Sequence, residues 1–206
     1  MPEPRQHAGF IEWGVAGRPF PGEKVSGDRH AVVPRPEGML VAVIDALGHG
    51  AAAESTARKA SGILERHAGD PLPFLIQRCH EGLTGDRGAV IGAAVIDGRR
   101  GTMSWAGVGN VLGLLIPGAE GTRTAERLLA PPGIVGGQLP ALRAESIPLA
   151  AGDLILLATD GLREGLVDGL LPGDGDLQQL AERLILDYAT GNDDALVLIV
   201  RYVGCP

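Results

Sequence analysis

Hydrophobic residues in this chain fall into short runs bounded by Gly, Pro or Arg, a pattern typical of β-strands. We predict strands at residues 10–17, 29–34, 39–44, 89–97, 102–109, 111–117, 142–149, 153–159 and 195–203. The run at 195–203 is almost wholly apolar, which predicts a strand inside a sheet, covered on both faces.

Between these runs, apolar residues recur every three to four positions, as they do on the buried face of an α-helix. Helices are predicted at residues 51–67, 71–82 and 176–188. A short helix is also expected after Gly161. The Gly- and Pro-rich stretch 117–140 and the stretch 168–176 are expected to be loops.

The order of these elements indicates how the strands pair. Residues 29–34 and 39–44 flank the turn sequence Arg35-Pro36-Glu37-Gly38 and should form a hairpin. The three strands between residues 89 and 117 are expected to form an antiparallel meander, and the two strands between 142 and 159 are expected to pair. Helices grouped between antiparallel strands predict an α+β layered fold.

Length and composition narrow the class of protein. With 206 residues and 45% hydrophobic content, the chain fits one domain over residues 1–206. The net charge of −7 and the scattered basic residues argue against a nucleic-acid surface. The N-terminus lacks the pattern of a secretory signal, and no apolar run approaches the roughly 18 residues of a membrane span. We therefore expect a cytoplasmic protein without nucleic-acid or membrane partners.

Acidic residues stand at the ends of several predicted strands. If Pro34 pairs with Met39 across the hairpin turn, Asp28 lies opposite Asp45. Like charges placed opposite each other on a sheet are destabilising unless a cation lies between them. The pattern is repeated further along the chain, because Asp160 ends one apolar run and Asp193-Asp194 precedes another. If these strands are neighbours, the acids meet at one edge of the sheets.

A carboxylate cluster without His or Cys partners favours a hard cation such as Mg²⁺ or Mn²⁺ over Zn²⁺. One carboxylate shared between two ions gives the two-metal arrangement that hydrolyses phosphate esters. The residues alone thus indicate hydrolysis of a phosphate ester.

Several short motifs also resemble a known family. They are Ser26-Gly27-Asp28, the stretch from Asp45 to Gly50, Gly107-Val108-Gly109-Asn110, Thr159-Asp160-Gly161 with Glu164, and Asn192-Asp193-Asp194. In this order they resemble metal-dependent protein phosphatases of the 2C type, in the bacterial branch named after the sporulation phosphatase SpoIIE. The resemblance implies a four-layer αββα sandwich in which two antiparallel sheets are flanked by helices. It also implies direct hydrolysis of phosphoserine or phosphothreonine by water that two Mn²⁺ or Mg²⁺ ions activate.

Carried over to this sequence, the resemblance implies four catalytic and metal-binding aspartates: Asp28, Asp45, Asp160 and Asp193. Asp45 would bridge both ions. Asp160 and Asp193 would bind the first ion, and Asp28 would bind the second.

Other positions have lesser roles in this interpretation. The backbone carbonyl of Ala46 would help to hold one ion, although the family usually has Gly at this place. Asp194 would orient the ligands without binding an ion. Leu196 replaces a threonine common in the family, and Arg29 is the candidate for a phosphate-binding arginine. His49 is not expected to be a ligand, because a histidine at a helix entry is more often a packing or surface residue.

The chain is similar in length to the free-standing RsbX-type phosphatases of this branch, and this resemblance implies phosphorylated STAS-domain proteins of the bacterial stressosome as partners. The expected role is a negative regulator of the stress response. Two alternatives stay open. One is an inert module that uses the same fold to bind a phosphoprotein or regulator, and the other is hydrolysis of a small phosphate ester or nucleotide.

Overall fold

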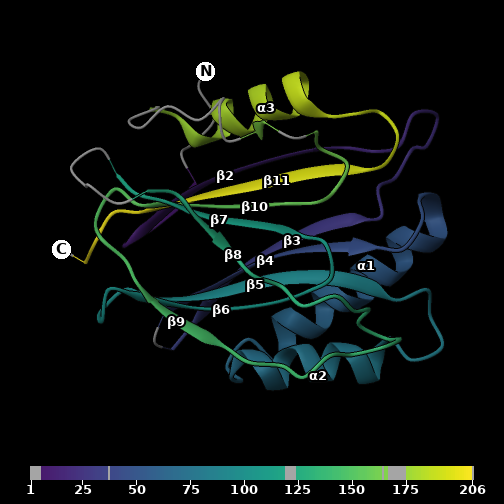
Figure 1. Cartoon of the computed structure of the whole chain (residues 1–206), viewed down its shortest axis with the longest axis horizontal. Coiled ribbons are helices and arrows are strands. Elements are labelled where there is room, and N and C mark those ends of the chain that lie inside the picture. Colours follow the sequence, from purple (N-terminus) through teal and green to yellow (C-terminus); the bar gives the residue numbers. More distant parts are fainter. Residues whose placement is uncertain (1–5, 37, 119–123, 164, 167–174, 206) are drawn as a thin grey trace.

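The computed structural model of the chain (Figure 1) describes residues 6–36, 38–118, 124–163, 165–166 and 175–205. Two antiparallel sheets lie face to face at its centre. Helix α3 (Leu177–Tyr188) covers the outer face of one sheet, and helices α1 (Gly50–Arg66) and α2 (Leu72–Gly82) cover the outer face of the other. The fold is therefore the predicted α+β sandwich with αββα layers.

The first sheet has six strands within the described residues, in the order β1-β2-β11-β10-β7-β8. They are β1 (Gln6–Ala8), β2 (Ile11–Arg18), β11 (Ala195–Tyr202), β10 (Leu154–Ala158), β7 (Leu112–Ile116) and β8 (Glu126–Leu128). Strand β11 lies between β2 and β10, which confirms the interior position predicted from its apolar sequence.

The second sheet has five strands in the same part of the chain, in the order β3-β4-β5-β6-β9. They are β3 (Asp28–Arg35), β4 (Gly38–Ala46), β5 (Ala89–Asp97), β6 (Thr102–Val108) and β9 (Glu145–Pro148). Helix α1 packs on β3 and β4, and α2 contacts β5 and β6.

Within the described residues, three hydrophobic cores hold the four layers together, and the strands in the middle of each sheet contribute side chains to two of these cores. In β4, Leu40, Ala42 and Ile44 face the helices α1 and α2. The alternate residues Met39, Val41 and Val43 face the other sheet. In β11, alternate side chains likewise face the core between the sheets and the core under α3. This double burial explains the continuous apolar runs, since a strand exposed on one face alternates apolar with polar residues.

The predicted hairpin has the register expected from its turn. Pro34 pairs with Met39, and Asp28 lies directly opposite Asp45.

Two predicted pairings are wrong. Strand β7 does not continue a meander from β6 but crosses to the six-stranded sheet and pairs with β10. Strands β9 and β10 do not pair with each other, because β9 joins β6 in one sheet and β10 joins β7 and β11 in the other. Strands β7 and β10 are buried on both faces, so their apolar sequences carry no signal of which sheet they join. Strand β9 is instead the mostly exposed edge strand of its sheet. Gly109, at φ 91°, lies at the crossing between β6 and β7.

Two short strands were not predicted. Strand β8 lies inside the stretch 117–140 that was expected to be a loop, and β1 precedes the first predicted strand. The short helix expected after Gly161 and most of the loop expected at 168–176 lie outside the described residues. Among the described helices, none is long and apolar enough to cross a membrane.

Candidate active site

The topology brings acidic residues from both sheets to one end of the sandwich. Asp28 is the first residue of β3 and lies opposite Asp45, the last residue but one of β4. Asp160 follows β10 and Asp193 precedes β11, and these two strands are antiparallel neighbours. The end of one strand therefore lies beside the start of the other, as the sequence predicted.

A threonine hydroxyl joins the two sheets at this point. Thr159 Oγ1 donates a hydrogen bond of 2.6 Å to Asp28 Oδ2 in the opposite sheet. The same oxygen accepts the backbone N–H of Leu196, the second residue of β11, at 2.9 Å. The hydroxyl thus fixes one carboxylate oxygen of Asp28 relative to the strand pair that carries Asp160 and Asp193.

Burial and mutual repulsion make the carboxylates on β3 and β4 hard to ionise. Burial raises the pKa of Asp28 from 3.8 to about 7, with a further rise from neighbouring carboxylates and an opposing effect of the Thr159 hydroxyl. Burial also raises the pKa of Asp45 from 3.8 to about 8, and the charge of Asp28 is the next largest cause. Asp160, Asp193 and Asp194 raise the pKa of both groups, so all five side chains share one electrostatic site.

This donor set fits a divalent cation of the Mg²⁺ or Mn²⁺ kind, because all donors are carboxylate oxygens that repel one another unless positive charge separates them. Among the described residues, no three His, Cys, Asp or Glu side chains form a group that could hold an ion as they stand. Two of the carboxylates accept hydrogen bonds from other groups. Asp160 Oδ2 accepts Asn110 Nδ2 at 2.5 Å, and Asp193 Oδ1 accepts the backbone N–H of Asp194 at 2.8 Å.

Asp194 is buried and holds the segment that leads into β3. Its Oδ1 accepts the backbone N–H of Phe20, and its Oδ2 accepts the backbone N–H of Gly27, both at 2.7 Å. A side chain at Gly27 would collide with Ala53 on α1, because a Cβ there would lie 2.7 Å from the Ala53 Cβ. The carboxylate of Asp194 therefore fixes the backbone immediately before Asp28.

The turn after Asp45 is stabilised by a second set of contacts. Gly48 and Gly50 both have positive φ, 82° and 74°, which explains the glycines on either side of His49. The His49 ring stacks on Phe20 with centroids 4.2 Å apart, and its Nδ1 lies 3.1 Å from Glu23 Oε1. These partners give His49 a packing role in the structure. Ala46 is buried within β4.

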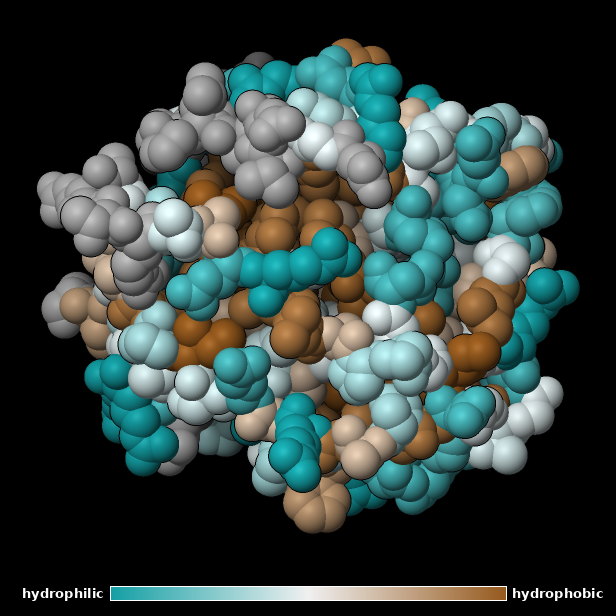
Figure 2. All heavy atoms as spheres, in the orientation of Figure 1, coloured by the Kyte–Doolittle hydropathy of each residue, from teal (hydrophilic) through white to brown (hydrophobic). Residues whose placement is uncertain are grey.

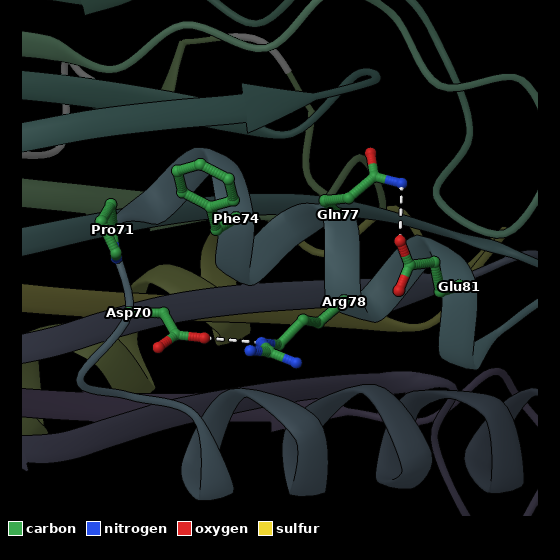
Figure 3. Close-up of a pocket in the computed structure, with 6 residues that line it drawn as sticks. All are labelled: Asp70, Pro71, Phe74, Gln77, Arg78 and Glu81. Carbon is green, nitrogen blue, oxygen red and sulfur yellow. Dashed lines mark hydrogen bonds and ion pairs between the residues drawn. The ribbon is translucent and has the colours of Figure 1, made fainter.

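Two hollows differ in their relation to this site. One of about 280 Å³ includes Asp28 and is lined also by Arg29 and by Glu54 of α1, whose side chains lie 3.5 Å apart. The other, of about 260 Å³, lies on α2 and contains none of the candidate ligands (Figure 3). Its Arg78 is paired with Asp70 at 2.6 Å.

On the face seen in Figure 2, hydrophobic residues reach the surface in several areas separated by hydrophilic ones.

Two residues of the site were not assigned a role from sequence. Thr159 and Asn110 belong to the motifs that carry the family resemblance, so their positions were marked, but neither has a charge or a metal-ligand character that reveals its function. Only the hydrogen bonds across the structure show that Thr159 orients Asp28 and Asn110 contacts Asp160.

Solved structures share this fold over almost the whole chain. The crystal structure of RsbX in complex with magnesium has a TM-score of 0.83 at 20% identity and covers 96% of this chain and 98% of that one. A structure from work on the bacterial stressosome as a modular system adapted to control secondary messenger signalling has a TM-score of 0.86 at 30% identity. It covers 93% of this chain and 99% of the other. The fold and the relatives together define a protein serine/threonine phosphatase domain with the 2C-type fold.

Sequence comparison identifies the branch. Residues 35–203 match the family of Stage II sporulation protein E (SpoIIE), and the chain belongs to this family. A curated relative, the phosphoserine phosphatase RsbX of Bacillus subtilis (strain 168), is 23% identical over 180 residues, which is 87% of this chain and 88% of the relative.

Proposed function

We propose that this phosphatase acts on phosphoserine or phosphothreonine in STAS-domain proteins of a stressosome, and that it does so with two Mn²⁺ or Mg²⁺ ions. The observation that carries the proposal is the meeting of Asp28, Asp45, Asp160 and Asp193 at one end of the two sheets. Asp45 would be shared by the two ions, Asp160 and Asp193 would hold the first, and Asp28 would hold the second. The carbonyl of Ala46 would assist.

The ions, when bound, supply positive charge that lowers the pKa of a water molecule and offsets the repulsion between carboxylates and phosphate. The chain's own residues position the ligands. The Thr159 hydroxyl holds one oxygen of Asp28 at 2.6 Å, and Asp194 fixes the backbone before it through two bonds of 2.7 Å. The Asn110 amide restrains Asp160 at 2.5 Å. Such partners beyond the ligands commonly decide metal affinity.

The substrate class is supported by likeness to two proteins. The relative RsbX is a phosphoserine phosphatase matched over most of both chains, and the structure with a TM-score of 0.86 comes from work on the stressosome. A negative regulator of the stress response is the role that follows for this chain.

The test is phosphate release from a serine-phosphorylated STAS-domain protein, measured with Mn²⁺ and with EDTA. We expect release that needs Mn²⁺ and falls at least about 100-fold in Asp45→Asn, because the amide replaces one of the two carboxylate oxygens with an NH₂ group and removes the negative charge. Glu126→Gln is the control, since Glu126 is an exposed carboxylate on β8 and its loss should leave the rate unchanged.

Different failures point to different conclusions. Release from p-nitrophenyl phosphate but not from the phosphoprotein would overturn the substrate class and favour a small phosphate ester. A folded protein that binds no Mn²⁺ in calorimetry and releases no phosphate would instead be an inert module that binds a phosphoprotein or regulator.

A further inference from the structure

An arginine outside the predicted site lies against the turn that follows Asp45. Arg87 belongs to the loop between α2 and β5, and a Cβ built on Gly48 would be 2.7 Å from its Nη1. The guanidinium therefore rests on the bare backbone of Gly48, whose φ of 82° also disfavours a side chain.

The backbone on either side of Arg87 is tied to neighbouring elements. The carbonyl of Gly88 accepts the N–H of Leu47 at 3.1 Å, and β5 begins at Ala89, which pairs with Ala46. On the other side, the carboxylate of Asp86 forms an ion pair with Lys59 of α1 at 2.8 Å. The position of residue 87 beside the Asp45 turn is thus set by strand pairing, and does not depend on the arginine side chain itself.

Arg87 differs from nearby basic residues in having no acidic partner. Lys59 is paired with Asp86, and both Arg29 and Arg58 contact Glu54. Within the part of the chain that the structure describes, no carboxylate lies within ion-pair distance of Arg87, and its side chain is exposed. A guanidinium that is already neutralised contributes little to binding an anion, whereas Arg87 retains its full charge and all its donors.

We propose that Arg87 binds the phosphoryl group of the substrate at the edge of the carboxylate site. This inference rests on the proposed phosphatase function and adds a substrate-binding residue to it. Four carboxylates at the site repel a phosphate dianion, so an unpaired cation on the turn beside Asp45 favours its approach. The planar fork of arginine matches two phosphate oxygens at once, which a lysine ammonium does not. The glycine at position 48 allows Arg87 to lie against the turn, because any side chain at this position would displace the guanidinium.

The experiment compares Arg87→Gln, Arg87→Lys and the control Arg99→Gln. Arg99 follows the other end of β5, about 30 Å away along the strand, so its loss removes the same charge at a distance. Three quantities are measured for each protein: kcat/KM on p-nitrophenyl phosphate and on the phosphorylated STAS-domain protein, the inhibition constant of inorganic phosphate, and Mn²⁺ affinity by calorimetry.

We expect Arg87→Gln to lower kcat/KM on both substrates and to weaken inhibition by inorganic phosphate, each by about 10- to 100-fold. The kcat/KM values and the phosphate inhibition of Arg87→Lys should lie between those of Arg87→Gln and those of the wild type. Mn²⁺ affinity should stay within about twofold of the wild type, since Arg87 touches no ligand carboxylate.

Two results would overturn the role of Arg87 while leaving the phosphatase function intact. One is an Arg87→Gln protein that matches Arg99→Gln in activity and phosphate inhibition. The other is a parallel loss of Mn²⁺ affinity and activity, which would mean that the arginine only supports the turn. An inactive wild type would overturn the phosphatase function and this inference together.

Discussion

Replacing Asp194 by asparagine tests the contact that fixes the segment before Asp28. The buried carboxylate accepts two backbone N–H groups, from Phe20 and Gly27, each at 2.7 Å. Asparagine has the same size but offers one acceptor oxygen, and its NH₂ group must face the other N–H donor. One charge-assisted bond is lost and one buried donor loses its partner.

The size of the effect follows from these two bonds. A hydrogen bond to a charged group contributes about 1.5–3 kcal/mol, and an unsatisfied buried donor costs about 1–3 kcal/mol. Removing a negative charge from the cluster offsets part of this loss, because Asp194 raises the pKa of Asp28. We expect the free energy of unfolding to fall by about 2–4 kcal/mol, which lowers Tm by about 5–15 °C in a domain of this size.

The assay is chemical unfolding combined with amide hydrogen exchange. Exchange at Phe20 and Gly27 should accelerate in Asp194→Asn more than exchange in α3, because the loss is local to the loop. Asp193→Asn is the matched control: its exposed side chain accepts a single N–H at 2.8 Å, so its stability should change by less than about 1 kcal/mol. Equal losses in the two variants, or unchanged exchange at both amides, would refute this account of Asp194.

Three further predictions concern the same region. Asp28 and Asp45 have native pKa values of about 7 and about 8, against an ordinary value of 3.8, so the native state keeps protons that the unfolded state releases. In EDTA, the free energy of unfolding should therefore decrease between about pH 4 and about pH 8, and Asp45→Asn should weaken that decrease. An unfolding midpoint that rises with pH in the wild type would contradict this. Thr159→Val should lower the free energy of unfolding by about 1–3 kcal/mol and reduce phosphatase activity, because the hydroxyl that joins the two sheets is lost. Thr159→Ser keeps the hydroxyl and should retain the stability and the activity of the wild type. Denaturant midpoints and phosphate release measure the two effects. Gly161→Ala should lower the free energy of unfolding by about 2–4 kcal/mol in thermal unfolding, because its Cβ would overlap a backbone carbonyl of the segment before β11. Gly175→Ala is the control and should leave stability unchanged, because open space surrounds Gly175. Similar losses in both variants would show that packing is not the cause.

Local sequence patterns predict the described helices, most of the strands and the hairpin of β3 and β4. The turn at residues 35–38 fixes the register of its hairpin, so Asp28 could be placed opposite Asp45 by counting alone. The helices follow from their apolar period, and the apolar run of β11 predicted an interior strand. These features depend on backbone geometry and on neighbours a few residues away, which a sequence contains directly.

Long-range packing selects the sheet that each strand joins and the partners that hold the carboxylates. The sequence predicts a meander and a pair of strands that the structure divides between the two sheets. Strands β7 and β10 are buried on both faces, so their apolar sequences contain no signal of which partner they take. The hydrogen bonds of Asp194 span more than 160 residues, and the contact of Arg87 with Gly48 joins a loop to a distant turn. Such contacts have no local signal, because they arise only when the layers are assembled.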